Sequence, residues 1–469
     1  MSNKQLEAKV KTNIMIVVVS CALFMEAVDT TIINTAIPVM AKSLHVNPVD
    51  LKIALISYLL SLAIFIPISG WIADKFGTKQ VFITALSIFT LSSAWCGFTH
   101  SLPELVLARC VQGLGGSLTL PVGRLILLRT YERHQLINVM SKVIMVASLG
   151  LMLGPVLGGF ITHYFSWRWV FWVNIPVGIF AIIAAYYFLE YMPKKNVLPL
   201  DLSGFILFGS ALAAFTFGLS ALSETFLSDK IAVSIIAISV FLFMTYVIHS
   251  RKINNPVINV SLFQYRTFLI SVLGNLFARF SFGGVPFLLP LLLQIGLGYN
   301  PQISGLLIAP MAVGVLLVKL FTFRLLRIFG YKRLLILNTT LVALCLWGFT
   351  VITSELSIYI IILQTFLFGL IIAVQYSGMN SLAYAELSPE HLSSAASIMG
   401  TLQQLAQSFG VALGAFLLRY YSTGSKGMFN LTAPIFHHVF FTMGIITLFS
   451  TIIFFQLKPG DGHEMIDPD

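Results

Sequence analysis

Charged side chains are scarce in this 469-residue chain: Asp, Glu, Lys and Arg together make up 10% of it, against about 25% in an average soluble domain. Hydrophobic residues reach 57%, and the mean hydropathy is +0.91. This balance excludes an ordinary soluble domain. A formal net charge of +10 could suggest a nucleic-acid partner, but the basic residues stand in short loops between long apolar runs, so we expect no nucleic acid.

Groups that carry metal, redox or phosphate chemistry are equally sparse. Cys21, Cys96, Cys110 and Cys345 all lie inside apolar runs without Cys-x-x-Cys spacing, and no histidine cluster accompanies them. We interpret them as small buried hydrophobic residues, which predicts neither disulfides nor a metal site. The sequence shows no nucleophile paired with a base and no phosphate-binding loop signature. We therefore expect no enzyme activity and no cofactor, and coupling to an ion gradient remains as the energy source.

Apolar runs long enough to cross a bilayer are abundant. A membrane-spanning helix needs about 20 apolar residues, since each residue advances about 1.5 Å. The sequence therefore predicts an all-α polytopic membrane protein with fourteen transmembrane helices. The predicted spans are 14–37, 51–73, 80–99, 104–127, 138–161, 168–190, 202–222, 230–250, 268–294, 303–323, 333–353, 357–385, 393–420 and 434–456.

The distribution of loop cations predicts the orientation. The loops after every second span are rich in cations, namely Lys75 and Lys79, Arg129 and Arg133, Lys194 and Lys195, Arg251, Lys252 and Arg266, and Arg327, Lys332 and Arg333. The alternate loops hold few, such as Lys42, Lys230 and Lys426. Since cationic loops stay inside, we expect a multi-pass protein of the plasma (inner) membrane with both termini cytoplasmic. The first span carries acids and is too long for a signal peptide, so we expect it to be retained.

The first span contains two acids near its middle, Glu26 and Asp29. An intramembrane carboxylate costs about 2.5–3.5 kcal/mol on insertion scales, so it normally faces a cavity and marks a substrate or proton pathway. The alternative is a buried acid that a neighbouring helix satisfies. Three residues apart, the two side chains share one helix face, and their mutual repulsion disfavours double ionisation.

Three further motifs lie in the first half of the chain. GWIADKFGTK, residues 70–79, joins the second and third spans. There Gly70 and Gly77 would allow close packing and a sharp turn, while Asp74, Lys75 and Lys79 would pair or cap helix ends. LVLARCVQGLGGS, residues 105–117, places Arg109 within the fourth span, where the side chain either snorkels to the surface or acts inside the membrane.

The fifth span contains GLMLGPVLGGF, residues 150–160. Gly154, Pro155, Gly158 and Gly159 predict a kink and a close approach of a neighbouring backbone. Ordinary helix packing explains any single glycine cluster equally well.

Taken together and in this order, VDTTIINTAIP (28–38), GWIADKFGTK, LARCVQGLGG and GPVLGG resemble the motifs of the major facilitator superfamily. WRWVFWVNIPVG, NPVINVSLFQYRTF and LLLQIGLGYNPQISGLLIAPMAVG are similar to its fourteen-span drug:proton antiporter branch, the EmrB/QacA type. The resemblance implies the major facilitator fold, with six-helix bundles at 1–195 and 256–469, an inserted helix pair at 196–255 and a substrate site between the bundles. It also implies proton coupling through Asp29, tuned by Glu26 and assisted by Arg109.

Polar residues in the second half are candidates for substrate binding. Arg279 lies about 16 Å into the ninth span, before Gly283, Gly284, Pro286 and Pro290, which predict a bend or unwinding beside the cavity. It could face the two acids as an ion-pair partner or contact the substrate. Further candidates, which could equally be interhelical hydrogen-bonding groups, are Gln375, Asn380, Gln403, Gln404 and Gln407.

Other intramembrane cations have a simpler interpretation. Arg124, Lys142 and Lys319 lie within about two turns of span ends, so snorkelling is expected for them. If Gly330 corresponds to Gly77, Arg327 stands where the first half has Asp74, and the second copy of the loop motif has lost its acid.

The sequence predicts a proton-coupled exporter of small amphipathic compounds, of the multidrug-efflux type, that works by alternating access. Two alternatives stay open: a proton-linked metabolite or siderophore permease of unknown direction, and a non-transporting membrane sensor on the same fold. The expected partners are a small-molecule substrate, protons and the lipid bilayer. Whether a periplasmic adaptor also binds is left open by the sequence.

Overall fold

The computed structural model describes residues 3–131, 133–194, 197–222, 228–318, 321–422 and 431–465. Within these ranges every regular element is a helix and no strand occurs. This follows from the long apolar runs, because only a helix satisfies its own backbone hydrogen bonds in hydrocarbon. Lys195, Lys319 and Lys426 lie outside the described residues. So does the predicted boundary between 195 and 196, and the division into three parts stays a prediction.

The first half of the chain supplies eight α-helices and one short 3₁₀ turn, which together make six membrane crossings. They are α1 (Asn3–Leu44), α2 (Lys52–Phe65), η1 (Ile66–Ile68), α3 (Ser69–Phe76), α4 (Thr78–Phe98), α5 (Leu102–Thr130), α6 (Arg133–Tyr164), α7 (Trp169–Trp172) and α8 (Asn174–Phe188).

Two helices follow and then the second half. The helices are α9 (Leu202–Ala221), α10 (Asp229–Ser250), α11 (Arg266–Phe282), α12 (Val285–Leu291), α13 (Pro301–Val318), α14 (Thr322–Gly348), α15 (Ile358–Leu382), α16 (Leu392–Ser422) and α17 (Ala433–Phe455). Short helical turns η2 (Val260–Gln264), η3 (Leu292–Gly296), η4 (Phe349–Val351), η5 (Pro389–His391) and η6 (His463–Met465) connect or extend them.

Each of the fourteen predicted spans coincides with helix. Among the described residues, thirteen helical segments are apolar and long enough to cross a membrane. The helix α16 is 31 residues long and completes the set by length, although its glutamines and serines make it more polar than the others. The predicted bend of the ninth span is confirmed, since α11 ends at Phe282, α12 starts at Val285, and η3 is a π-helical turn.

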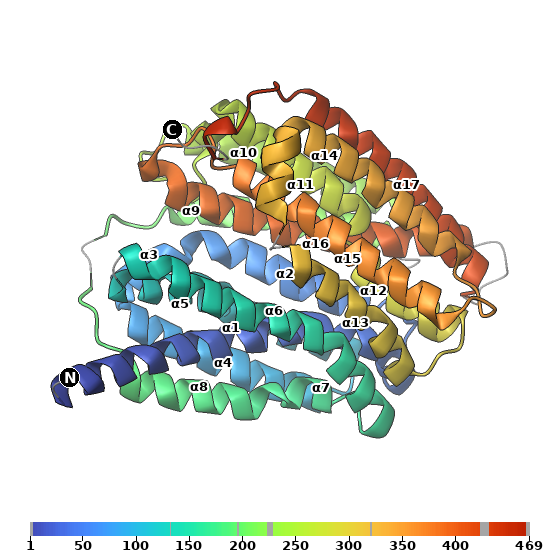
Figure 1. Ribbon diagram of the computed structural model, residues 1–469, viewed down its shortest axis with the longest axis horizontal. Coiled ribbons are helices and arrows are strands. Elements are labelled where there is room, and N and C mark those ends of the chain that lie inside the picture. The colour runs from blue at the N-terminus through green and yellow to red at the C-terminus, as the bar shows by residue number, and fades with distance from the viewer. Residues whose placement is uncertain are drawn as a thin grey trace.

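Both ends of the described chain lie at the same end of the helix bundle (Figure 1). We call this end, which carries the first turns of α1 and the segment after α17, the terminal face, and the other end the opposite face. The helices of the first half gather on one side of the molecule and those of the second half on the other (Figure 1). An even number of crossings produces this arrangement.

The two halves meet along a seam. Helix α6 packs against α13 on one edge of the seam, and α2 packs against α16 on the other. The inserted helix α9 contacts both α2 and α16, whereas α10 packs on α9. Of the apolar spans, α10 is the least buried, with 17% of its most apolar window buried. Helix α10 is thus peripheral, whereas α9 lies against both halves.

On the edge away from α9, a shallow groove of about 530 Å³ lies between α6, α13 and α15. Its lining is almost wholly apolar and includes Leu153, Leu306, Val313 and Phe366. The lipid-facing surface of the bundle is therefore not smooth on this edge.

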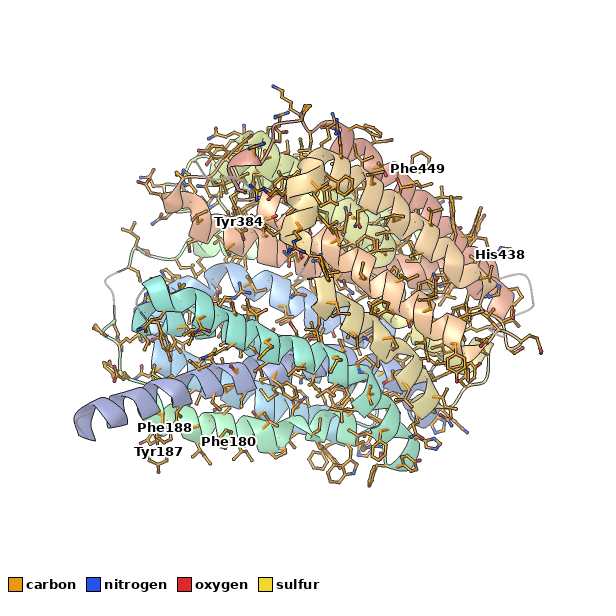
Figure 2. All side chains as sticks on the ribbon, viewed as in Figure 1. Phe180, Tyr187, Phe188, Tyr384, His438 and Phe449 are labelled. Atoms are coloured by element: carbon orange, nitrogen blue, oxygen red, sulfur yellow. The ribbon has the colours of Figure 1, made fainter. Side chains whose placement is uncertain are left out.

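Large apolar side chains cover the outer surface of the bundle. Phe180 and Tyr187 point outward from α8, and Phe449 points outward from α17 (Figure 2). Such a surface suits hydrocarbon but not water. Cys110 is also exposed on α5, whereas Cys96 is buried and Cys21 and Cys345 are partly buried. The prediction that all four cysteines are buried is therefore wrong for Cys110 and holds fully only for Cys96. The helix period explains this, because an apolar run that spans a bilayer has a lipid-facing side as well as a packed side.

Candidate functional site

The Asp29 carboxylate is the centre of a buried polar cluster in the first half. It is 1% exposed and accepts three hydrogen bonds. Arg109 Nη1 donates to Oδ2 at 2.7 Å, while Gln112 Nε2 and Asn174 Nδ2 each donate to Oδ1 at 2.9 Å. The donors come from α5 and α8, so the cluster connects these two helices to α1. These bonds stabilise the ionised form of the carboxylate.

Arg109 is buried with Asp29 and does not snorkel. Its side chain is 1% exposed, and Nη1 also donates to Gln112 Oε1 at 2.7 Å. The guanidinium carbon lies 4.1 Å from the centre of the Tyr58 ring, in a cation–π contact. The snorkelling alternative is therefore wrong, because helix packing covers Arg109 on every side. Removing one partner of such a pair leaves an uncompensated buried charge, which costs about 3–5 kcal/mol.

Glu26 lies one helical turn from Asp29, nearer the terminal face, and its surroundings differ. It is partly exposed, and its Oε2 is buried with no hydrogen-bond partner among the described residues. The charged groups whose fields act on it are Asp29 and Arg124. The two acids thus share a helix but not an environment: one is saturated with donors, and the other has an unsatisfied oxygen.

Arg124, on α5, has an exposed side chain that lies within electrostatic range of Glu26 in the first half and of Tyr384 in the second. Snorkelling of Arg124 stays a prediction.

Arg279, on α11, stacks on an aromatic ring of another helix of the same half. Its guanidinium carbon lies 3.6 Å from the centre of the Tyr376 ring on α15, and its Nε donates to Asn275 Oδ1 at 3.4 Å. No carboxylate pairs with it among the described residues, and Asp29 is already paired with Arg109. The ion-pair alternative for Arg279 is therefore wrong in this structure, and a cation with only aromatic and amide neighbours remains.

The polar side chains of α15 and α16 divide into two groups. Gln375 is fully buried; its Oε1 accepts from Asn338 Nδ2 at 2.8 Å and its Nε2 donates to Thr339 Oγ1 at 2.9 Å. These bonds join α14 to α15 and match the interhelical alternative for Gln375. Partly exposed Gln403 donates to Asn380 Oδ1 at 3.0 Å.

Gln407 reaches the break in the ninth span. It is partly exposed, and its Nε2 donates to the carbonyl oxygen of Gly283 at 2.7 Å. This carbonyl lies where α11 ends, so the amide satisfies backbone that the break sets free. Since Gly283 follows Arg279 by one turn, Gln407 and Arg279 lie close to the same irregular segment.

The loop motif after the second span forms the contacts that its residues predict, with one exception. Asp74 pairs with Arg129 at the end of α5, and Lys79 Nζ donates to the Tyr186 carbonyl at 2.7 Å. Gly77 has a φ of +95°, a conformation that favours glycine. Lys75 stacks on the Trp71 ring at 4.4 Å. Close packing at Gly70 is wrong, because nothing lies within 4 Å of where a Cβ would stand.

The glycines of α6 bring two different neighbours close. A Cβ at Gly154 or Gly158 would collide with Thr31 or Ile32 of α1, within the first half. A Cβ at Gly159 would collide with the Pro301 carbonyl of α13, in the second half. The carbonyl of Pro155 approaches Gly305 of α13 equally closely. The opposite-face ends of α6 and α13 are therefore in backbone contact across the seam.

A second contact closes the seam at the opposite face. Gln294 Nε2, in the π-helical turn η3, donates to the Thr35 carbonyl oxygen of α1 at 2.9 Å. Towards the terminal face, by contrast, Lys142 and Met145 of α6 are exposed. The halves are thus joined at the opposite face.

Sequence reasoning missed several residues of this site. Gln112 stands three residues after Arg109, so helix spacing alone could have placed both beside Asp29. Asn174 is a polar residue in an otherwise apolar run and was a detectable signal. Tyr376 was not predictable, because an aromatic residue in an apolar span is ordinary. No metal cluster is found among the described residues.

Comparison with known proteins agrees with this architecture. The sequence family described as "Major Facilitator Superfamily" matches residues 19–272 and 271–465. The multidrug resistance protein MdtD of Escherichia coli O139:H28 (strain E24377A / ETEC) is 34% identical over 452 residues, 96% of this chain and 95% of that protein. The MdtD protein of Shigella flexneri serotype 5b (strain 8401) is 35% identical over the same length.

Solved structures show the same fold at low sequence identity. An auto-inhibited POT family peptide transporter has a TM-score of 0.69 at 15% identity, with 95% of this chain and 96% of that chain covered. A D-xylose–proton symporter has a TM-score of 0.67 at 15% identity, with 96% and 98% covered. With family matches that together span nearly the whole chain, and with relatives above 30% identity, this multi-pass membrane protein belongs to the Major Facilitator Superfamily.

Proposed function

We propose that this protein is a proton-coupled secondary exporter of small amphipathic compounds and works by alternating access. The observation that carries the proposal is the buried pair of Asp29 and Arg109, with Glu26 one turn away towards the terminal face. Relatives named as multidrug resistance proteins support the substrate class. The residue roles that follow belong to this proposal.

The terminal face is the cytoplasmic side in this proposal, as the loop cations predict. The described state, closed at the opposite face, then opens inward. Three donors and the Arg109 charge surround the Asp29 carboxylate in this state, an arrangement that suits a carrier without its proton. In this proposal the state follows release of the proton to the cytoplasm and precedes export.

Asp29 carries the proton, and Glu26 relays it. The unsatisfied oxygen of Glu26 gives a proton a place to bind one helical turn from Asp29, on the side of the terminal face. On the outward-open side of the cycle, a proton on Asp29 would cancel its attraction to Arg109 and loosen the cluster. Each proton that enters down a potential of 100 mV releases about 2.3 kcal/mol, which helps drive export uphill.

The second half supplies the substrate contacts in this proposal. Arg279, Gln403, Asn380 and Gln407 are partly exposed and belong to helices α11, α15 and α16. Their amides are adaptable donors and acceptors, and the Tyr376 ring adds an aromatic surface. One half would then handle protons while the other handles the compound.

A permease for anionic metabolites is the second candidate, and Arg279 favours it. A guanidinium that stacks on Tyr376 without a carboxylate attracts anions and repels cations. The two candidates differ in the charge of the preferred compound and not in the proton pathway.

The test uses purified protein in liposomes with an imposed proton gradient. We expect gradient-driven accumulation of ethidium, a cationic amphipathic dye, for an exporter of multidrug type, and of carboxyfluorescein for an anion permease. The matched control is Glu104→Gln, a partly exposed acid at the opposite-face end of α5 and outside the proton-coupling cluster, which should leave transport unchanged. If neither dye moves with the folded protein, the alternative of a non-transporting sensor gains and the exporter proposal fails.

Orientation in the plasma (inner) membrane is part of the same proposal. In a cysteine-free background, a membrane-impermeant thiol reagent applied to intact cells should label Glu355→Cys, in the loop between α14 and α15 at the opposite face. It should not label Lys252→Cys, at the terminal face. Both side chains are exposed, so accessibility alone decides the result. The reverse labelling would invert the orientation.

A further inference from the structure

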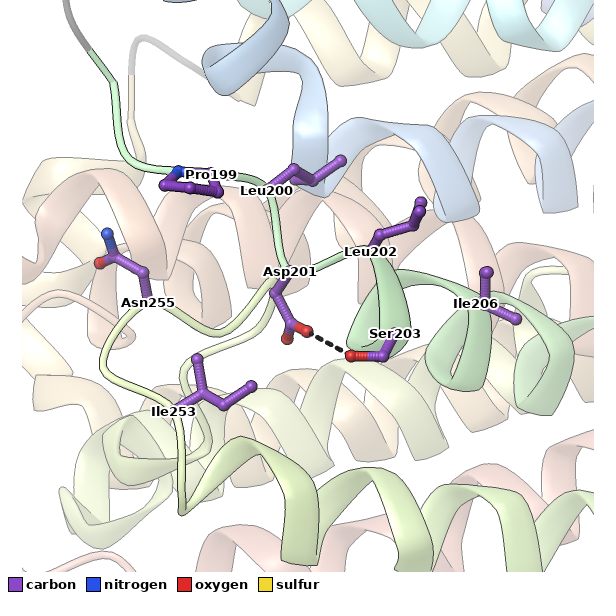
Figure 3. Close-up of a pocket in the computed structure, with 8 residues that line it drawn as sticks. All are labelled: Pro199, Leu200, Asp201, Leu202, Ser203, Ile206, Ile253 and Asn255. Carbon is purple, nitrogen blue, oxygen red and sulfur yellow. Dashed lines mark hydrogen bonds between the residues drawn. The ribbon is translucent and has the colours of Figure 1, made fainter.

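A cavity lies where the inserted helix pair begins and ends, away from the seam residues described above. It has a volume of about 620 Å³ and is lined by residues 199–203, Ile206, Ile253 and Asn255 (Figure 3). The lining therefore combines the segment before α9, the first turn of α9 and the segment after α10. All three lie at the terminal face.

Asp201 is the acidic residue of this lining, and it is only partly satisfied. Its side chain is 3% exposed. Oδ1 accepts from the Gly204 amide at 2.8 Å and from Ser203 Oγ at 3.2 Å, and lies 2.8 Å from His249 Nε2. Oδ2 is buried and has no partner among the described residues. A buried carboxylate oxygen without a donor is costly, so a ligand that donates there is stabilised.

The charge of the cavity favours a cation. Burial raises the pKa of Asp201, but hydrogen bonds from His249, Gly204 and Ser203 outweigh burial and hold that pKa below its ordinary value. Asp201 is therefore ionised at neutral pH. Asp201 is the one charged residue among those that line the cavity. Arg251 and Lys252 are exposed at the end of α10 and are not part of the lining.

The remaining wall is apolar and faces outward. Leu202 is 60% exposed and Ile206 is 57% exposed, on the first two turns of α9. Pro199, Leu200 and Ile253 extend the same surface. An acid beside an apolar wall at the end of a membrane span lies at the level where lipid head groups meet hydrocarbon.

We infer that this cavity binds an ammonium group carried on an apolar chain, with the ammonium on Asp201 and the chain along Leu202 and Ile206. A primary ammonium fits better than a quaternary one, because Oδ2 needs a hydrogen-bond donor. Two sources supply this chemistry: a cationic amphiphile dissolved in the membrane, and the head group of an aminophospholipid. The site does not depend on the proposed transport function.

The test uses the full-length protein in phosphatidylcholine nanodiscs and a dodecylammonium probe with a photoreactive diazirine in its chain. After illumination, mass spectrometry should find the label on residues 199–206. Unlabelled dodecylammonium should compete, and dodecyltrimethylammonium should compete more weakly. Nanodiscs that also contain phosphatidylethanolamine distinguish the sources: protection identifies the lipid as a ligand, and unchanged labelling identifies the dissolved amphiphile.

Asp201→Asn is the decisive variant. Asparagine also caps a helix, so the start of α9 is preserved while the charge is lost. A charge-assisted hydrogen bond contributes about 1.5–3 kcal/mol, so labelling should fall by about tenfold or more. The matched control is Asp461→Asn, an acid at the same face that pairs with Arg266. Its labelling should stay unchanged.

Two results would overturn the inference. Equal labelling of Asp201→Asn and the wild type would show that the carboxylate does not hold the probe. Equal labelling by an uncharged dodecanol diazirine would reduce the cavity to an apolar surface. Ile206→Ser supplies a second variant with intact charge, and its labelling should fall because the chain loses its wall.

Discussion

The two halves of the molecule repeat a fold but not its charges. In the first half, Asp29 and Arg109 form a buried pair with Gln112 and Asn174 as further donors to the carboxylate. In the second, Arg279 stacks on Tyr376 and no carboxylate pairs with it among the described residues. One proton on Asp29 would change the net charge of the Asp29–Arg109 pair, whereas the Arg279 guanidinium keeps its charge at every physiological pH. The difference teaches that a repeated scaffold can divide proton handling from substrate contact.

The loops after the second and tenth crossings extend this comparison to backbone geometry. Gly77 and Gly330 both have positive φ, +95° and +67°, so the predicted correspondence between them is supported by conformation. The charge differs again: Asp74 pairs with Arg129, whereas Arg327 stands at the equivalent position in the second half. The second loop therefore keeps the backbone conformation of the first but lacks the acid at the position of Asp74.

The strongest test of the division exchanges the charged residues for neutral ones. Asp29→Asn should abolish gradient-driven export while it spares some energy-independent exchange, because substrate contacts remain intact. Arg279→Gln should keep proton coupling and change which compounds are carried. Liposome transport with and without a proton gradient measures both. Loss of coupling in Arg279→Gln, together with normal coupling in Asp29→Asn, would reverse the assignment.

Glu26 refines the same comparison. Glu26→Gln should keep transport but shift its pH optimum, since the proposed relay and the charge beside Asp29 are both lost. Proton release on addition of a transported dye, measured in detergent across pH, checks this. If release is complete in Asp29→Asn and absent in Glu26→Gln, then Glu26 is the carrier and Asp29 the residue that tunes it.

The glycines of α6 separate packing within a half from packing between halves. Gly159→Leu should stop the opposite face from closing, because the side chain would meet Pro301, and transport should be lost while the protein still folds. Gly158→Leu should lower thermal stability by about 1–3 kcal/mol through overpacking against α1. Of the two variants, Gly159→Leu should lose more transport and Gly158→Leu more thermal stability, when both are measured on each. The same stability loss in both would remove the distinction.

Gly77→Ala and Gly330→Ala test whether backbone shape is equivalent in the two halves. Each should cost about 1–3 kcal/mol, because a side chain at this φ is strained. The free energy of unfolding in detergent is the measurement, and Gly70→Ala, in open space with ordinary helical geometry, is the neutral control. A cost at Gly77 alone would mean that the second loop tolerates strain.

The smallest effect is expected at the ion pair of the first loop. Asp74→Asn should lower stability by at most about 1 kcal/mol, because a partly exposed ion pair contributes little. Arg129→Gln should have the same effect, and the double variant no more than either single one. Additive losses would show that the two residues act on different partners.

Prediction from sequence succeeded where one physical constraint dominated. Hydrophobic length placed the fourteen spans, and the glycines and prolines around 283–290 placed the break in the ninth. It failed where a side chain's surroundings depend on helices far away in sequence. Gln375 was left open between substrate binding and interhelical bonding, and its bonds to Asn338 and Thr339 depend on how α14 packs on α15.

The candidate site was predicted only in part for the same reason. Glu26 and Asp29 were placed together because three residues separate them. A rotation of roughly 60° around the helix is nevertheless enough to place the Asp29 carboxylate among donors and to leave an oxygen of Glu26 without one. The identity of the donors required the packing of α5 and α8 against α1. Helix spacing fixes a face, and the neighbouring helices decide what that face meets.

The position of α9 also constrains the direction in which the halves can separate. It touches α2 and α16, one helix from each half, along one edge of the seam, whereas the other edge carries the apolar groove between α6, α13 and α15. If α9 holds the two halves together along this edge, the halves rotate about a hinge there and separate more at the other edge. Spin labels on α6 and α13 should therefore report a larger change of distance during transport than labels on α2 and α16. The lipids would then meet a moving protein surface only at the edge formed by α6 and α13.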